Sequence, residues 1–264
     1  MNEIKIVYKY RSWENVQHRN ILYENELYLS SPRDFNDPFD CRIVPDLTLL
    51  DNDEKIEKFA NKLALNSSDQ IAQRGLDLKQ VTEGFAKRLK NNLAEESAGY
   101  RQMFYDSQDK FYGILSLTFR WDSILMWAHY ANYHQGFCVG FDKDKLDNSN
   151  LFGKGGPVNY KDEFPRIDPF DDDLVKLGFI ETHTKAKNWE YEEEYRLFQR
   201  NNKGFTPESR VIKILDNYFS EVIVGQRFPE ADIIKIKRIA ESKQVKAFRI
   251  VKTENRFKFE KIEI

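Results

Sequence analysis

The sequence predicts an α+β protein in which mixed and antiparallel strands surround a split core, with an inserted block of helices. Several short segments alternate between apolar and polar residues, as half-buried strands do. Residues 52–110 instead carry apolar residues at helical spacing. Strands and helices do not alternate regularly along the chain, which argues against a doubly wound α/β sheet. We therefore expect one domain over residues 1–264, with residues 52–110 as a helical insertion within it.

The first alternating segment, residues 3–10, places Tyr8 and Tyr10 on one face of a strand and Lys9 on the other. A short helix at 12–23 and a short strand at 26–30 are expected next. Residues 31–40 follow as a turn-rich loop, because two prolines and an Asn-Asp pair favour turns.

The helical block is expected to form two or three amphipathic helices, because Ile56, Phe59 and Leu63 keep helical spacing near its start, as do Phe85 and Leu89 further on. Breaks are expected near residues 67–68 and 75. The second half of the chain is predicted to hold helices at 121–132, 171–187 and 231–244, and strands at 113–119, 136–141, 189–198, 210–215, 221–224, 245–251 and 256–264.

Charge and composition narrow the classes of function. The chain has 41 Lys+Arg and 43 Asp+Glu, so a formal net charge of −2 gives no global attraction to nucleic acid or membrane, although a local basic groove is compatible with it. Aromatic residues make up 14% of the chain and suit either core packing or the walls of a site for a flat ligand. Two cysteines exclude a disulfide framework, and no apolar run is long enough to span a membrane. Without an apolar leader segment, we expect a cytoplasmic protein with no membrane partner.

The segment at residues 189–196 is the richest in titratable groups. As a strand, it places Glu190, Glu192, Glu194 and Arg196 on one face. Neighbouring carboxylates repel, so at least one pKa should rise unless a cation such as Arg196 compensates. This pattern suits acid–base chemistry or ribose binding. As a helix, Glu192 and Arg196 would form an ordinary surface pair.

Three other segments offer candidate ligand contacts, although core packing is the favoured interpretation of the tyrosines and the histidine, and turn formation explains the loop well. Tyr8 to Arg11 can place rings and cations against a planar ligand, and Asn36 and Asp37 can face a site from the loop. Trp127, His129 and Tyr130 cluster on a predicted helix. The spacing of His129 and His134 does not match a helical zinc site, and no carboxylate spacing specifies magnesium, so no metal is expected.

Four segments together resemble a bacterial family known only as domain of unknown function 2971: YKYRS, LYLSSPRDFNDPFD, MWAHYANYHQGFCVGF and KNWEYEEEYR. The resemblance covers most of the chain in order, and the helical block is its variable part. The family label implies no activity.

The order of elements also resembles the ADP-ribosyltransferase superfamily. That resemblance implies a first strand at Tyr8, Lys9, Tyr10 and Arg11, a middle region with Ser116, Thr118 and Tyr130, and a late glutamate at Glu194 or Glu192. The first strand lacks the histidine, and the middle region lacks the Ser-Thr-Ser triplet, of that superfamily. The resemblance implies NAD as substrate, tyrosines around the nicotinamide, and a protein or nucleic-acid acceptor. A toxin or phage-defence role would suit such an enzyme, although no residue specifies it.

Three hypotheses follow. The first is an NAD-using ADP-ribosyltransferase or glycohydrolase, with Glu194 as the key carboxylate supported by Glu192 and Arg196. The second is a metal-dependent nuclease in which Asp37 and Asp40 join the two glutamates. The third is a non-catalytic nucleotide sensor whose helical block binds a partner. The residues expected to contact substrate are Tyr8, Lys9, Tyr10, Arg11, Asn36, Asp37, Ser116, Thr118, Trp127, His129 and Tyr130.

Overall fold

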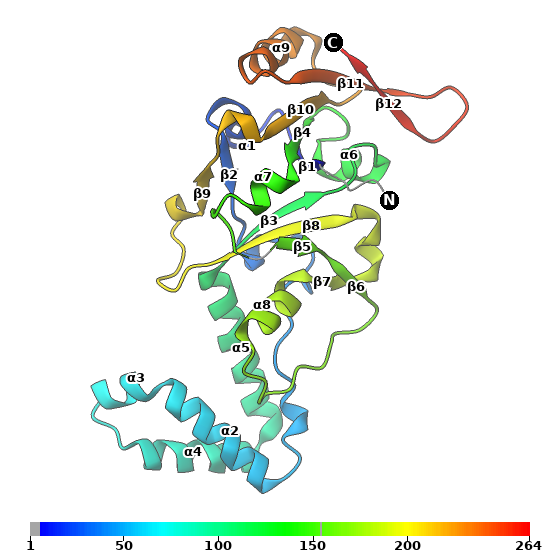
Figure 1. Ribbon diagram of the computed structural model, residues 1–264. Helices are drawn as coiled ribbons and strands as arrows, with labels where there is room; N and C mark the ends of the chain where they lie inside the picture. The colour runs from blue at the N-terminus through cyan, green and yellow to red at the C-terminus, as the bar shows by residue number, and fades with distance from the viewer. Residues whose placement is uncertain (1–5, 154) are drawn as a thin grey trace. The chain divides into compact units, whose positions relative to one another are not determined.

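The computed structural model describes residues 6–153 and 155–264, which form two compact units (Figure 1). The first unit takes its described residues from 6–41, 110–162 and 182–264, and the second comprises 42–109 and 163–181. The predicted helical block at 52–110 falls almost entirely in the second unit, together with residues 163–181. The interpretation of the whole chain as one domain stays a prediction. Residues 1–5, part of the predicted first strand, lie outside the described residues.

An eight-stranded sheet forms the centre of the first unit, in the order β12-β11-β10-β4-β1-β3-β8-β5 (Figure 1). Neighbouring strands are antiparallel except β10 and β11, which are parallel. This confirms an α+β class with a mostly antiparallel sheet. In sheet order, the strand bounds are Phe259–Glu263, Lys246–Lys252, Phe219–Val224, Phe137–Asp142, Ile6–Arg11, Tyr112–Thr118, Glu194–Arg200 and Gly155–Pro157.

Both faces of this sheet are apolar, because successive residues of a strand point to opposite sides. Val7 belongs to one buried cluster and its neighbour Tyr8 to another. Helices α1 (Val16–Tyr23) and α9 (Ile233–Ser242) contribute to the cluster of Val7. Helix α6 (Ile124–Tyr130) contributes Met126 and Trp127 to the cluster of Tyr8. Burial on both faces makes the sheet a rigid frame for the strand ends around it.

The sheet opens between β1 and β3. The paired position of these strands in the described chain is Tyr8 opposite Thr118, whereas β1 continues its pairing with β4 as far as Arg11. Past Tyr8, the Lys9 side chain reaches across, and its Nζ donates to the Ser116 carbonyl at 2.5 Å. A side-chain donor thus takes the place of a ladder hydrogen bond. The separation leaves polar side chains of both strands facing a common space.

Residues 187–193 correct the strand predicted over 189–198. Lys187–Glu192 form a 3₁₀ segment, Glu193 is left-handed with φ 42°, and β8 begins at Glu194. The Thr118 hydroxyl donates to the Glu192 carbonyl at 2.5 Å and anchors this turn. Alternation along the sequence cannot anticipate a tertiary hydrogen bond of this kind. As a result, Glu190 is exposed and does not share the buried face of Glu192.

Smaller elements complete the first unit. β2 (Glu26–Tyr28) pairs with β9 (Val211–Lys213), and β6 (Asn159–Lys161) pairs with β7 (Thr184–Ala186). The helix predicted over 171–187 is therefore too long, since α8 (Leu174–His183) ends where β7 begins. The remaining short elements are α7 (Lys143–Asp147) and 3₁₀ turns at Pro32–Asp34, Glu208–Arg210, Asp216–Tyr218 and Glu230–Asp232.

The second unit is helical. It contains the 3₁₀ turn Leu47–Leu49, the helices α2 (Asp53–Asn66), α3 (Ser68–Gln73) and α4 (Leu78–Asn91), most of α5 (Leu93–Phe111), and most of α8. The breaks expected near residues 67–68 and 75 are confirmed: α2 ends before Ser67, and Gly75 follows α3 at a positive φ of 67°. Phe59 is 1% exposed at the centre of its core. No helix within the described ranges is long and apolar enough to cross a membrane.

Candidate functional site

A cavity of about 370 Å³ lies in the first unit where β1 and β3 separate. Strands β1, β3 and β8 line it together with α6 and the loop at residues 30–40. Its lining residues are Tyr8, Lys9, Tyr10, Arg11, Ser30, Asp34, Phe35, Asn36, Asp40, Ser116, Leu117, Thr118, Met126, His129, Tyr130, Lys185, Glu192, Glu194 and Arg196.

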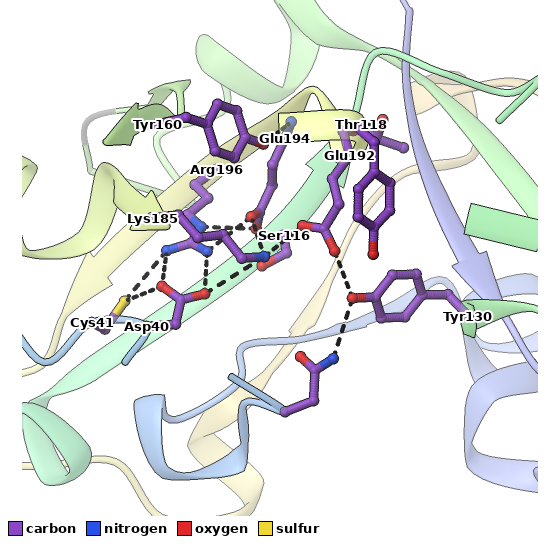
Figure 2. A network of polar contacts seen from close by, with 12 residues as sticks. Asp40, Cys41, Ser116, Thr118, Tyr130, Tyr160, Lys185, Glu192, Glu194 and Arg196 are labelled. Carbon is purple, nitrogen blue, oxygen red and sulfur yellow. Dashed lines mark hydrogen bonds and ion pairs between the residues drawn. The ribbon is translucent and has the colours of Figure 1, made fainter. Parts of the chain in front are cut away.

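Arg196 on β8 organises the charged wall of this cavity (Figure 2). Its side chain is 0% exposed, and its guanidinium bridges two carboxylates. Nε and Nη2 donate to the two oxygens of Glu194, each at 2.8 Å. Nη1 and Nη2 donate to the two oxygens of Asp40 at 2.8 and 2.6 Å, and Nη1 also donates to the Thr182 carbonyl at 2.7 Å. The planar fork of arginine suits two carboxylates at once.

Lys185 on β7 is the second buried cation. Its Nζ lies 2.5 Å from Glu192 Oε2, 3.1 Å from Glu194 Oε2 and 3.7 Å from Asp40 Oδ2. The five charged side chains are each at most 5% exposed. Three carboxylates against two cations leave one excess negative charge in a poorly solvated place. Such a cluster is costly to bury unless every charge is paired. Here each of the three carboxylates forms an ion pair with Lys185, Arg196 or both.

The carboxylates of Glu192 and Glu194 differ in how many of their acceptor positions are filled by hydrogen bonds. Glu194 accepts from Arg196 twice, from Lys185 and from the Ser116 hydroxyl, which matches the roughly four lone-pair positions of a carboxylate. Although burial opposes ionisation, Arg196 and Lys185 hold the pKa of Glu194 well below its ordinary value. Burial raises the pKa of Glu192 above its ordinary value, and Lys185 offsets only part of that rise. Two neighbouring carboxylates therefore have pKa values displaced in opposite directions, a pattern typical of functional sites.

Tyr130 orients Glu192 from α6. Its hydroxyl donates to Glu192 Oε1 at 2.6 Å and accepts from Asn36 Nδ2 at 3.4 Å (Figure 2). Glu192 thus receives two donors, Tyr130 on one oxygen and Lys185 on the other. Each oxygen retains one acceptor position, so the carboxylate can accept two further hydrogen bonds from a ligand.

Lys9 and Arg11 bring positive charge to the cavity from β1. No acidic side chain in the described part of the chain forms an ion pair with either of them. Burial lowers the pKa of Lys9, and the charge of Arg11 lowers it further. Burial also lowers the pKa of Arg11, to about 10. Both shifts indicate cations that an anionic ligand would stabilise.

Aromatic rings form the apolar walls. The Tyr8 hydroxyl donates to Glu221 Oε1 at 3.0 Å, and the Tyr10 hydroxyl donates to the Arg120 carbonyl at 2.9 Å. These bonds fix both rings, and burial raises the pKa of both phenols. The Phe35 ring centroid lies 5.4 Å from the Arg196 guanidinium carbon. The aromatic side of the cavity is therefore flat, rigid and uncharged.

The structure brings most predicted site residues to this one cavity. Glu192, Glu194 and Arg196 line it with nine of the predicted contact residues: Tyr8, Lys9, Tyr10, Arg11, Asn36, Ser116, Thr118, His129 and Tyr130.

Two predicted contact residues lie elsewhere. Trp127 is 0% exposed in the core, where its indole N–H donates to the Trp121 carbonyl. Asp37 is 5% exposed and accepts the Phe39 N–H within its own loop. Trp127 therefore serves local structure, and Asp37 uses one oxygen within its own loop, while its buried Oδ2 has no hydrogen-bond partner among the described residues.

Sequence reasoning missed Lys185 and named Asp40 only as a metal ligand of the nuclease hypothesis. Lys185 carries no local signal, since it lies in a segment predicted to be helical. The pairing of Asp40 with Arg196 spans 156 residues, so local pattern could not predict it. The repulsion expected between Glu192 and Glu194 is the sequence feature that could have indicated a second cation beside Arg196.

A metal centre has little support in this arrangement. No group of three or more His, Cys, Asp or Glu in the described ranges has the placement of a metal site. Asp40, Glu192 and Glu194 do converge, but Lys185 and Arg196 already occupy the space between them. A divalent ion would have to displace two buried cations.

Comparisons with known proteins give one match. No curated protein and no solved structure matches the chain. Residues 126–197 match the model of a family described as "Protein of unknown function (DUF2971)". This segment includes Tyr130, Lys185, Glu192, Glu194 and Arg196, but not β1 or the loop at residues 30–40. Over this segment, which carries one side of the charged cavity, the chain is similar to the DUF2971 family of proteins of unknown function.

Proposed function

We propose that the cavity binds NAD and cleaves its nicotinamide–ribose bond, either by hydrolysis or by transfer of ADP-ribose to an acceptor. The observation that carries this proposal is the partly occupied carboxylate of Glu192. Its two oxygens accept from Tyr130 and Lys185 and retain one acceptor position each. Two adjacent ribose hydroxyls would supply two donors to those positions.

The chemistry needs a negative charge fixed close to C1′ of the ribose. When the C1′–N bond breaks, its electron pair leaves with nicotinamide, and the sugar develops oxocarbenium character. Water or an acceptor nucleophile then adds to C1′ and loses its proton. A buried carboxylate stabilises the developing positive charge more strongly than one in water. We assign this role to Glu192, and we assign Glu194 to holding Arg196 and Lys185 in place.

The other walls suit the rest of the dinucleotide. Lys9 and Arg11 would hold the two phosphates, since neither has an acidic partner among the described residues. The rings of Tyr8 and Tyr10 offer flat apolar surface for nicotinamide. A volume of about 370 Å³ suits the nicotinamide mononucleotide half, with the adenosine half extending outward.

The order of charged residues supports the resemblance to ADP-ribosyltransferases. That resemblance implies an early strand with a basic residue and a late strand that supplies a glutamate. Here β1 carries Lys9 and Arg11, Glu194 begins β8, and Glu192 ends the 3₁₀ segment before it. The basic pair would replace the histidine of the superfamily pattern. This part of the proposal is by analogy.

The test is nicotinamide release from NAD by wild type, Glu192→Gln and the matched control Glu190→Gln, which changes an exposed carboxylate of the same turn. We expect about a 10²–10³-fold loss in Glu192→Gln and no loss in the control. NAD labelled on the adenine side identifies the acceptor by where the label attaches. Binding is measured in parallel as the rise in melting temperature with NAD. Equal release in both variants would contradict the role of Glu192, and no binding and no release by wild type would contradict the proposal.

A nucleotide-sensing module is the second candidate. The observation that favours it is that Glu192 and Glu194 are both engaged in buried ion pairs, as in a site built for binding. The same experiment separates the two functions. NAD that raises the melting temperature of wild type without release of nicotinamide, with protein, DNA or RNA supplied, would favour the sensor.

A further inference from the structure

A second cavity, of about 820 Å³, lies in the first unit at the turn between β11 and β12. Residues 253–258 form this turn, which projects beyond the strands at the red end of the chain (Figure 1). The lining also includes His134 and Arg227. The proposed NAD chemistry uses none of these residues, so the cavity needs a separate explanation.

The cavity is strongly basic. Four exposed cations line it: Arg227, Lys252, Arg256 and Lys258. No ion pair joins any of the four to an acidic side chain of the described chain. Glu254 is the acidic residue of the lining. Because the formal net charge of the whole chain is −2, this local excess of positive charge marks a surface for an anionic partner.

Aromatic rings accompany the cations. Phe257, between Arg256 and Lys258, is 101% exposed, so both faces of its ring are open. The buried Phe259, two residues later, contacts the His134 ring edge-on, with centroids 5.6 Å apart. A fully exposed phenylalanine is unfavourable in water, and one flanked by two unpaired cations points to a partner with flat rings.

One lining residue of this cavity also has a buried polar atom without a partner. His134 Nδ1 is buried and has no hydrogen-bond partner in the described part of the chain. Burial and the nearby Arg227 lower the pKa of His134, so the imidazole is neutral at pH 7. A neutral imidazole nitrogen can donate to or accept from a ligand, according to its tautomer.

We propose that this surface binds single-stranded nucleic acid, with phosphates on the four cations and a base stacked on Phe257. Basic residues around an exposed aromatic ring are the usual means of binding single strands without strict sequence preference. The amides of Gln226 and Asn255, which also line the cavity, can contact base edges. An acidic peptide would satisfy the cations but would leave both faces of Phe257 uncovered. The surface does not depend on NAD cleavage.

The experiment measures fluorescence anisotropy of a labelled 20-nucleotide single strand, DNA and RNA in turn, with the full chain at 50 mM salt and without NAD. Wild type should bind, and its affinity should fall with salt at a logarithmic slope of about −3, as about four phosphate contacts imply. Phe257→Ala should weaken binding about 5- to 100-fold, through lost stacking. The charge reversal Arg256→Glu/Lys258→Glu should weaken it more.

The matched control is Arg74→Glu/Lys87→Glu, which makes the same change in net charge at exposed positions of the helical unit. Binding lost in the turn variants and kept in this control supports the proposal. Equal loss in both double variants, or no binding by wild type, overturns it. Displacement of the single strand by poly-glutamate at a lower concentration of charged groups than by unlabelled oligonucleotide assigns the surface to an acidic peptide instead. Because NAD is absent throughout, failure here is distinguishable from failure of the proposed function.

Discussion

The charge cluster around Arg196 makes a quantitative prediction about stability. The substitution Arg196→Met keeps the length of the side chain and removes its charge. It leaves Asp40 and Glu194, 3% and 4% exposed, with Lys185 as their remaining cation. Removing one partner of a buried ion pair costs about 3–5 kcal/mol, because the remaining charge is left buried and uncompensated. For a chain of this size, that corresponds to about 6–20 °C in melting temperature.

The matched control is Arg200→Met, at the exposed end of the same strand and without an ion pair among the described residues. It should change the free energy of unfolding by less than about 0.5 kcal/mol. Urea unfolding followed by tryptophan fluorescence is the assay, because all four tryptophans, at positions 13, 121, 127 and 189, belong to the first unit. The signal therefore reports the unit that contains the cluster.

The pH dependence of the free energy of unfolding provides a second, independent test of the buried charge cluster. In wild type, the lowered pKa of Glu194 stabilises the fold above pH 4.5, and this contribution is lost as the pH falls through the folded-state value. In Arg196→Met, the orphaned carboxylates should have raised pKa values and gain protons in the folded state as the pH falls. The stability difference between the two proteins should therefore shrink from pH 7 to pH 4.5. A difference equal to that of Arg200→Met, or one that grows on acidification, would refute the assignment of a charged buried cluster.

Three further predictions concern the cavity and its frame. Nicotinamide release should require ionised Glu192, so its rate should rise with pH around the pKa of Glu192, which lies above 4.5. Tyr130→Phe removes a hydrogen bond that lowers the pKa of Glu192, so the acid limb of the pH–rate profile should move to higher pH. Lys9→Gln and Arg11→Gln should each raise KM for NAD about 10-fold or more with little change in kcat, as steady-state kinetics will show. Gly136→Ala should lower the free energy of unfolding by about 1–3 kcal/mol in urea titrations, because its Cβ would collide with the Arg11 backbone oxygen; unchanged stability would contradict that close approach.

Local pattern predicted much of the frame correctly. The alternation around Tyr8 and Tyr10 gave the first strand and its faces, since a period of two is a property of the backbone itself. The helical block and its breaks at residues 67–68 and 75 followed from apolar spacing and from glycine. The strand predicted over 189–198 was wrong in its first half, because a hydrogen bond from Thr118, a residue far away in sequence, holds that half as a turn.

Local sequence specifies the residue types available for a site: a carboxylate-rich segment ending in Arg196, and tyrosines interleaved with cations at Tyr8 to Arg11. The roles of these residues follow from the folded arrangement. Asp40 and Lys185 reach the cluster from distant elements, and their cross-chain pairing saturates Glu194 while Glu192 keeps two acceptor positions. The reason is physical: burial and through-space charge set the pKa and the hydrogen-bonding capacity of a side chain, and neither depends on its neighbours in sequence.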